Sequence, residues 1–521
     1  METMNAPTIE WLQLSPLLIV LAGAVLGVLV EGIAPKAYRY FGQLCVLALT
    51  FACSLTMLIY NWFMGNAGVF AMGALALDGP SYIAWAFLLV FGALSLMLFA
   101  ERRVGHGASV FAAAAATVPG SRAEALAEVQ GREHTEVFTL GLFSLSGMMV
   151  FCAANDLITM FIALEVMSLP LYLLSAMARR RRMLSQEAAL KYFLLGAFAS
   201  AFFLFGIALM YGMTNTLSFT DMAQIIAAST STWPILAAVG LMAVGLLFKI
   251  GAVPFQSWVP DVYTGAPTPV TGFMAIGVKM AAVLGLTRVF LVPLGGLRWN
   301  WQVLLAIVAI LTMAVGAVMA LTQTNIKRLL AYSAISHAGF ILTAIVGAQA
   351  GIAEGQGPAF STAGSVLFYL IAYGFATITA FAIVTLVRNN AGEAWEISEW
   401  QGLGKKNPVV AVFFAIALLS FAGIPLTAGF IGKWAVFSAA WAGGYAWLAI
   451  VGIGFSLLAA YLYLKVIIAM FFKDPAPSVE VASASPATWI PIGVGTIASV
   501  GLGLVPGPLL ELISNFSVFL R

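Results

Sequence analysis

Three lysines and one glutamate lie inside long apolar runs of this sequence, where charged side chains are rare. Lys249 and Lys279 flank a stretch that several glycines and prolines interrupt, Lys433 follows a similar interruption, and Glu165 falls near the middle of another run. A charged side chain at the centre of a bilayer costs about 2.5 to 3.5 kcal/mol. Breaks in hydrophobic spans also point to ion or substrate sites in transporter-like folds. These residues are therefore candidates for ion or proton transfer.

Glu165 and Lys249 have opposite charges on different apolar runs, so an ion pair is the least costly way to bury both. At 4 Å and an effective dielectric constant near 20, such a pair attracts by about 4 kcal/mol. Lys279 and Lys433 have no acidic candidate in a nearby run. Because burial disfavours the charged form of an amine, both are expected to bind and release protons near neutral pH. A row of such groups bridged by water would form a proton relay.

Two further residues are candidates for this relay. His337, in AYSAISHAGF, has a side chain that titrates near neutral pH, although a hydrogen-bonded core histidine is the alternative. Lys191 lies close enough to the end of its run to reach the interface instead. Arg288 and Lys465 lie toward run ends, where we expect them to snorkel. Asp261 is expected at the cytoplasmic mouth between the seventh and eighth runs, as a turn-stabilising residue or as a group that attracts protons.

The composition is that of a membrane protein. Of the 521 residues, 62% are hydrophobic and 9% are charged, compared with roughly 45 to 50% and 25% in globular proteins. The three cysteines and three histidines show no spacing typical of a zinc or iron–sulfur site. We therefore expect no metal site, no bound cofactor and no nucleic-acid surface in this chain, and any redox chemistry must take place in another protein.

Fourteen apolar runs are long enough to cross a hydrocarbon layer of roughly 30 Å. They lie near residues 14–30, 42–63, 81–100, 137–154, 157–177, 188–211, 234–257, 268–292, 301–323, 329–347, 362–387, 409–438, 446–472 and 487–510. Connections after odd-numbered runs hold 16 basic residues, whereas the other connections and the termini hold two, Arg298 and Arg521. The positive-inside rule therefore favours fourteen helices with both termini outside the cytoplasm.

A weak internal repeat joins two of these runs. LLFKIGAVP in the seventh run and LLSFAGIPLTAGFIGKW in the twelfth both combine a glycine and proline break with a lysine. Because the two runs are five spans apart, the second copy would be inverted relative to the first. A chance match between apolar segments rich in glycine and proline is the alternative.

Three segments resemble a known family. PFQSWVPDVYTGAPTPVTGF, KRLLAYSAISHAGF and GIPLTAGFIGKW resemble signature stretches of the antiporter-like membrane subunits of proton-pumping NADH:quinone oxidoreductase, respiratory complex I. The resemblance covers roughly residues 130 to 475 and is greatest to the branch called subunit N. Gln256 departs from the pattern, because many members have histidine there, and glutamine cannot carry a proton near neutral pH.

The resemblance implies an all-α polytopic membrane protein that forms a single membrane domain over 1–521. Its fourteen transmembrane helices would include two inverted five-helix repeats, with discontinuous helices 7 and 12. The implied segments are 1–130 for three N-terminal helices and a cytoplasmic loop, 137–292 for the first repeat (helices 4–8), 301–472 for the second (helices 9–13) and 487–521 for the C-terminal helix.

The resemblance also implies a function. Glu165, Lys249, Lys279 and Lys433 match the family's buried charged positions on helices 5, 7, 8 and 12, and lysine at 433, where subunit M typically has glutamate, favours the N branch. Opening of a Glu165–Lys249 pair would drive a proton from Lys279 toward Lys433 and out, coupled to electron transfer in other subunits.

Several properties follow from that function. The partners would be the lipid bilayer and other complex I membrane subunits, including further antiporter-like ones, in a bacterial plasma membrane. NADH, FMN, iron–sulfur clusters and quinone would bind in other subunits of that enzyme. Two alternatives remain: a subunit of a multisubunit cation/proton antiporter, and a passive scaffold whose buried charges only specify helix packing.

Overall fold

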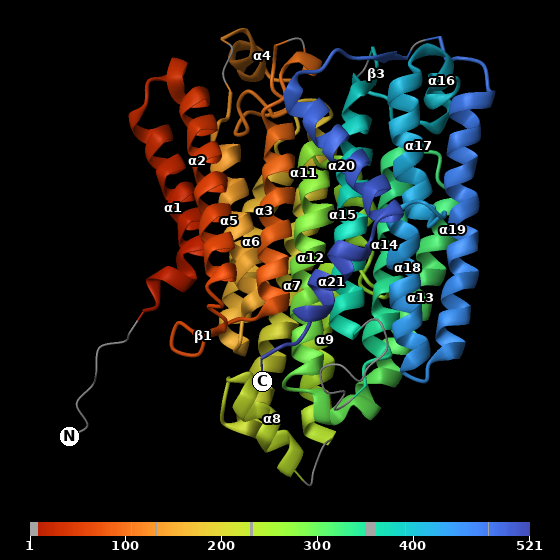
Figure 1. The fold of residues 1–521 in the computed structure, drawn as a ribbon. Coiled ribbons are helices and arrows are strands. Elements are labelled where there is room, and N and C mark those ends of the chain that lie inside the picture. The colour runs from red at the N-terminus through yellow and green to blue at the C-terminus, as the bar shows by residue number, and fades with distance from the viewer. Residues whose placement is uncertain are drawn as a thin grey trace.

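The computed structural model describes residues 9–105, 107–130, 133–229, 233–349, 361–390, 392–477 and 479–520. Within these ranges, thirteen helices are long and apolar enough to cross a membrane. They stand side by side as one bundle, with α1 and α2 at one side and α19 at the other (Figure 1). The predicted class, a helical polytopic membrane protein, is confirmed.

Twelve of these thirteen long helices are regular along their length. They are α1 (Trp11–Ile33), α2 (Lys36–Phe63), α3 (Gly79–Phe99), α5 (Glu136–Ala153), α6 (Leu157–Ser175), α7 (Arg182–Thr214), α9 (Trp233–Ile250), α13 (Arg298–Leu321), α14 (Ile326–Val346), α15 (Thr362–Leu386), α19 (Ala446–Phe472) and α20 (Pro486–Leu504). The thirteenth runs from Thr268 to Leu291 and consists of α11 (Thr268–Phe273), a π-helical segment (Met274–Val278) and α12 (Lys279–Leu291).

Shorter helices and strands lie mostly in the connections. The helices are α4 (Arg122–Val129), α8 (Phe219–Ala228), α10 (Trp258–Gly265), α16 (Leu403–Lys406), α17 (Pro408–Ala422), α18 (Ala428–Ala442) and α21 (Gly507–Asn515), with 3₁₀ turns at Arg103–Gly105, Gly295–Leu297 and Ile397–Trp400. The strands are β1 (Gly68–Phe70), β2 (Leu75–Leu77), β3 (Val387–Asn389), β4 (Gly392–Glu393) and β5 (Glu480–Val481). They pair antiparallel as β1–β2 and as a sheet of order β4–β3–β5. An all-α description omits these strands, which are too short to show a pattern in the sequence.

Two apolar runs are broken. The chain leaves the helical conformation between α9 and α10, and α17 and α18 divide the predicted run 409–438 into two helices of 15 residues each. Neither half alone is long enough to span a bilayer, so thirteen of the described helices qualify as spans rather than fourteen. The total of fourteen, the inverted repeats and the segment boundaries remain predictions.

A glycine in the left-handed conformation opens each break. Gly251 has φ +75° and Gly423 has φ +76°, a region that side chains other than glycine rarely adopt. A Cβ at Gly251 would lie 2.8 Å from Cγ2 of Val259, and one at Gly423 would lie 2.7 Å from Cδ of Lys433. Both the backbone conformation and the close neighbour therefore require glycine.

The connections at the two ends of the bundle differ in charge. Figure 1 shows α4, β3 and α16 at one end and α8 and β1 at the other. At the end with α4, Arg179 and Arg182 pair with Glu128 and Glu124, and α16 carries Lys405 and Lys406, as the positive-inside rule requires of one membrane side. Arg132 and Arg521, which contribute to that charge count, lie outside the described residues.

Both described ends of the chain meet at the β1–β2 hairpin. The Ala71 amide donates a hydrogen bond to Glu10 at 3.2 Å, and the Leu520 amide donates one to Asp78, just after β2, at 3.1 Å. The first and last described residues therefore lie on the same side of the bundle. Which side of the membrane this is remains a prediction.

The interior is formed by α14, α15 and the helix from Thr268 to Leu291. The most apolar window of α15 is 100% buried and those of the other two are 94% buried, compared with 33% for α1 and 28% for α2. The outer helices therefore leave apolar surface that suits lipid or other subunits. The interior helices carry Lys279 and His337.

Arg288 was expected to snorkel to the interface, and that expectation is wrong. Its side chain is 0% exposed and forms two hydrogen bonds of 2.8 Å with the Asp78 carboxylate, which is 2% exposed. Ser81 accepts a third bond at 2.7 Å, and the guanidinium lies 4.7 Å from the Phe519 ring centre. The end of α12 packs against protein rather than lipid, so a counterion within the protein is required.

Candidate functional site

One face of α14 lies between two of the predicted relay lysines. Ala334, His337 and Phe340 are spaced by three residues and so share one side of the helix. Lys279 Nζ donates a hydrogen bond to the Ala334 carbonyl at 2.5 Å, and Lys433 Nζ lies 5.1 Å from the Phe340 ring centre. His337 therefore stands between the two lysines, and all three ionisable side chains are buried.

Lys279 begins α12 directly after the π-helical segment. Such wide turns inside α-helices are frequent at functional sites. Besides the Ala334 carbonyl, the ammonium faces the ring of Tyr373, 4.8 Å from its centre. No carboxylate of the described chain lies within ion-pair distance of Lys279. The positive charge therefore has only neutral partners.

The side chain of Lys433, on α18, reaches back to the break between α17 and α18. Its Nζ donates to the carbonyl of Ala422, the last residue of α17, at 2.8 Å, and to Oγ of Ser456 on α19 at 2.7 Å. The last carbonyls of a helix have no partner within the helix and carry partial negative charge. The break thus supplies a site for a cation, and this lysine too forms no ion pair with a described carboxylate.

His337 is hydrogen-bonded on both ring nitrogens. Nδ1 and the Tyr369 hydroxyl are 2.6 Å apart, and Nε2 lies 3.4 Å from the Tyr463 hydroxyl. Tyr463 shares a further hydrogen bond with Ser333. A cavity of about 10 Å³ adjoins His337, Tyr369 and Ser420, which is near the smallest volume that holds one water molecule. Histidine, hydroxyls and a water-sized space are the components of a proton path.

The predicted ion pair between Glu165 and Lys249 is not formed. Lys249 Nζ instead donates to Ser168 Oγ at 2.7 Å and to the Tyr172 hydroxyl at 3.3 Å. Ser168 and Tyr172 follow Glu165 on α6 by three and seven residues, so the three share one face of that helix. Lys249 reaches that face one to two turns beyond the carboxylate.

Glu165 lies at the border between the exposed side of α6 and the face that meets Lys249. Its neighbours Ile162 and Val166 are exposed apolar residues, and its own side chain is half-buried. The atom Oε1 is buried and has no hydrogen-bond partner among the described residues. The carboxylate therefore lies beside the hydroxyl partners of Lys249, at the edge of this chain, without forming an ion pair with the ammonium.

Lys191 is separate from the buried lysines. Its side chain is 43% exposed, and Nζ forms ion pairs of 2.8 Å with both Glu187 and Asp261. Arg328 binds the other oxygen of Asp261 at 2.8 Å. Lys191 thus belongs to a surface network at the α10 break. Lys465 is exposed seven residues before the end of α19, and its snorkelling to the interface stays a prediction.

The hydroxyl partners of the lysines did not emerge from the sequence. For Ser168 and Tyr172 a signal existed, because their spacing from Glu165 places them on one helix face. Ser456, the partner of Lys433, and Tyr463, the partner of His337, gave no such signal, because each meets its partner from a distant helix. Gln256, the departure from the family pattern, has a buried Oε1 without a hydrogen-bond partner in the described structure.

Comparison with known proteins decides the family. Residues 154–459 match the family model described as NADH:quinone oxidoreductase/Mrp antiporter, TM. Subunit N of NADH-quinone oxidoreductase from Cutibacterium acnes is 50% identical over 99% of this chain and 96% of that protein. The Nocardioides sp. subunit N is 50% identical over 99% of both chains. The chain belongs to the subunit N family of NADH:quinone oxidoreductase.

Solved structures agree with membership in the subunit N family. A chain of respiratory complex I from Thermus thermophilus is 32% identical, with a TM-score of 0.75 over 96% of this chain and 99% of that one. A chain of the Mrp complex from Dietzia sp. has a TM-score of 0.80 over 97% of both chains at 20% identity. The second likeness shows the fold alone. The interpretation as an antiporter-like membrane subunit of the oxidoreductase is therefore confirmed over the antiporter alternative.

Proposed function

We propose that this subunit moves protons along a buried axis of Lys249, Lys279, His337 and Lys433. The observation that carries the proposal is the α14 face, where His337 lies between the contacts of Lys279 and Lys433. A lysine whose partners are neutral can lose its proton without leaving a buried carboxylate uncompensated. The tyrosine and serine hydroxyls and internal water would relay the proton between the fixed groups.

Electron transfer in other subunits would act on the buried lysines by changing the charge near Lys249. Moving one charge against 100 mV costs about 2.3 kcal/mol, and a unit charge at 4 Å and an effective dielectric constant near 20 contributes about 4 kcal/mol. Glu165, half-buried at the edge of α6, would respond to a neighbouring subunit and change the proton affinity of Lys249. Lys191 and Asp261 would then act at the cytoplasmic mouth rather than within the axis.

The assembly follows from the same proposal. The subunit would associate with other complex I membrane subunits, including further antiporter-like ones, in a bacterial plasma membrane with both termini on the non-cytoplasmic side. It would hold no redox centre itself, and NADH, FMN, iron–sulfur clusters and quinone would bind in other subunits. Its part in the enzyme would be translocation coupled to their electron transfer.

The test is Lys249→Met in the assembled enzyme, with NADH-driven proton pumping measured in vesicles. We expect the pumping rate per NADH oxidised to fall at least about tenfold, which corresponds to about 1.4 kcal/mol. Lys465→Met removes an exposed lysine and should leave pumping unchanged. Undiminished pumping by Lys249→Met, with assembly intact, would contradict the proposal.

The two alternatives predict different results in the same vesicles. A cation/proton antiporter would change the internal pH on addition of sodium without NADH or quinone. A passive scaffold would lose assembly on removal of the buried charges, while the complexes that do assemble would pump normally.

A further inference from the structure

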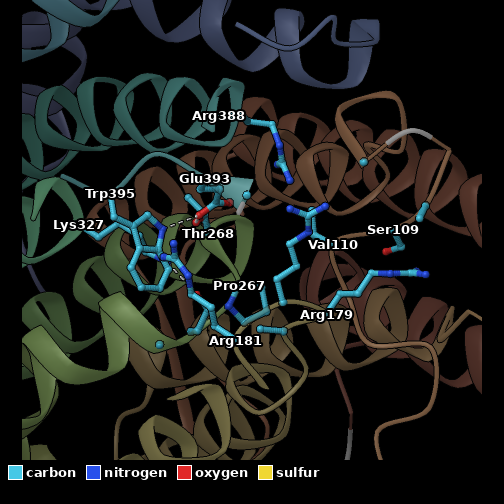
Figure 2. A pocket seen from close by; sticks show the side chains of 17 residues that line it. Ser109, Val110, Arg179, Arg181, Pro267, Thr268, Lys327, Arg388, Glu393 and Trp395 are labelled. Atoms are coloured by element: carbon cyan, nitrogen blue, oxygen red, sulfur yellow. Dashed lines mark hydrogen bonds between the residues drawn. The ribbon is translucent and has the colours of Figure 1, made fainter. Parts of the chain in front are cut away.

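A pocket with a large excess of positive charge lies at the α4 end of the bundle. It has a volume of about 110 Å³ and forms where the loop before α7, the start of α11, the first turn of α14 and the β3–β4 hairpin meet. Its basic lining residues are Arg179, Arg180, Arg181, Lys327 and Arg388. Figure 2 shows Arg388 and Arg181 entering from opposite sides, with Trp395 against Arg181. We call this the basic pocket.

The described carboxylates are too few to neutralise the basic pocket. Among its described lining residues Glu393 is the single acid, and its Oε2 accepts hydrogen bonds from Thr268 Oγ1 at 2.5 Å and Trp395 Nε1 at 3.3 Å. Arg179 is paired with Glu128 at 3.4 Å. The other four basic residues form no ion pair within the described chain. The described lining of the pocket therefore has a net positive charge and cationic hydrogen-bond donors that no carboxylate pairs with.

These cations are held in place by neutral contacts. Lys327 is 1% exposed, and its Nζ donates a single hydrogen bond, to the Ala266 carbonyl at 2.9 Å. An ammonium has three donors, so two have no partner in the described structure. The Arg181 guanidinium stacks 3.5 Å over the Trp395 ring centre, and Lys327 lies 5.2 Å from the same ring. Burial, with the nearby charge of Arg180, lowers the pKa of the Arg388 guanidinium, and the Glu393 carboxylate only partly opposes this shift.

The hydrogen-bond donors of the basic pocket and its volume indicate which kind of ligand it can bind. Guanidinium forks match phosphate oxygens bidentately, and a lysine adds a point charge. A volume of about 110 Å³ is well below the roughly 300 to 1,000 Å³ of pockets that enclose whole small molecules. The space therefore suits one tetrahedral anionic group rather than a nucleotide. Basic pockets between transmembrane helices on the cytoplasmic side recognise lipid headgroups in general, and these arginines belong to the predicted cytoplasmic connections.

We propose that the basic pocket binds one phosphate group, supplied by the headgroup of an anionic phospholipid of the surrounding bilayer. The phosphate would bridge the segments 178–181, 266–268 and 392–395 together with Arg388, which are far apart in sequence. One of these segments joins the α10 break to the helix of Lys279. Occupancy would thus stabilise the wall of the bundle beside the lysine axis without contacting that axis.

The test uses the purified full-length chain, stripped of lipid in a neutral detergent. Dihexanoylphosphatidylglycerol is the lipid probe, inorganic phosphate the free anion, and dihexanoylphosphatidylcholine the neutral-headgroup reference. Arg180→Gln with Arg388→Gln removes two unpaired cations of the pocket. We expect calorimetric titration to give an affinity for phosphatidylglycerol at least about tenfold weaker in this double variant.

Two further variants control for folding and for general charge. Arg122→Gln with Lys473→Gln removes two exposed cations outside the pocket, and its affinity should stay within about twofold of the unchanged chain. Arg180→Lys with Arg388→Lys keeps the charge but loses the bidentate geometry, so binding should be intermediate. This variant keeps the test decisive if the glutamine variant does not fold.

Each outcome has a defined meaning. Selective loss of phosphatidylglycerol binding in the pocket variant supports the proposal. Binding of inorganic phosphate with the same dependence, but not of the lipid, keeps the phosphate chemistry and overturns the lipid source. Absence of binding by both probes, equal weakening in the surface control, or an acidic protein segment filling the pocket in the assembled complex would overturn the proposal entirely.

Discussion

The two ends of α12 bury a positive charge in different ways. Arg288 is bound by the Asp78 carboxylate through two bonds of 2.8 Å and by Ser81 at 2.7 Å. Lys279, nine residues earlier, has one carbonyl at 2.5 Å and an aromatic face. An arginine cannot release its proton in a protein, whereas a buried lysine can. Within α12, the permanent charge thus has a counterion and the charge that can be given up has none in the described structure.

We expect the largest effect when the ion pair between Asp78 and Arg288 is broken. Asp78→Asn leaves the Arg288 charge buried without compensation, so the free energy of unfolding should fall by about 3 to 5 kcal/mol. Thermal or chemical unfolding of the purified chain in detergent measures it. Asp474→Asn is the matched control, because that side chain is 98% exposed and pairs with exposed Lys405; its effect should stay below about 0.5 kcal/mol. Equal losses of unfolding free energy in the two variants would show that the buried pair contributes no more to stability than the exposed one.

The reverse experiment is Lys279→Met. Because methionine fills a similar volume without a charge to bury, the stability should stay the same or rise. NADH-driven proton pumping should fall at least about tenfold, equivalent to about 1.4 kcal/mol. Lys36→Met, at an exposed position at the start of α2, should change neither quantity. A Lys279→Met enzyme that pumps normally but unfolds more readily would assign Lys279 the structural role of Arg288.

The glycines at the two helix breaks allow a similar test of Lys433. In Gly423→Ala the added Cβ meets Lys433 Cδ at 2.7 Å and should displace Nζ from the Ala422 carbonyl. We expect pumping to fall several-fold, in addition to a stability loss of about 1 to 3 kcal/mol from the left-handed backbone. Gly251→Ala has the same backbone cost but meets Val259, so its effect on pumping should be smaller. Equal pumping by the two variants at equal stability would contradict this difference.

The smallest effects are expected from single hydroxyls. Ser168→Ala leaves Lys249 with the Tyr172 bond of 3.3 Å, whereas Ser456→Ala leaves Lys433 with the Ala422 carbonyl at 2.8 Å. Loss of one such bond typically costs about 1 kcal/mol. Pumping should therefore fall a few-fold, and more in Ser168→Ala than in Ser456→Ala. The opposite order would show that the carbonyl at the break is not the stronger partner.

Features that depend on local sequence could be predicted. A lysine in an apolar run is visible directly, as at 249, 279 and 433, and so are the glycine and proline breaks beside these lysines. Hydrophobic runs of sufficient length gave the positions of most long helices to within a few residues. These signals are local because each reflects the cost of placing a polar group or a broken helix in hydrocarbon.

Contacts between distant helices could not be predicted. Asp78 and Arg288 are separated by 210 residues, and nothing local indicates that the end of α12 faces protein rather than lipid. The Glu165–Lys249 pair was expected from opposite charge alone, but the relative register of α6 and α9 places Ser168 and Tyr172 at the ammonium instead. Register of this kind depends on the packing of whole helices.

The carboxyl-terminal residues have a consequence for laboratory work. The Leu520 amide binds the carboxylate that neutralises Arg288, and Phe519 covers the guanidinium. A fluorescent protein or affinity tag fused directly after these residues would disturb the buried ion pair between Asp78 and Arg288. Versions of this chain labelled at that end should therefore carry a long, flexible spacer.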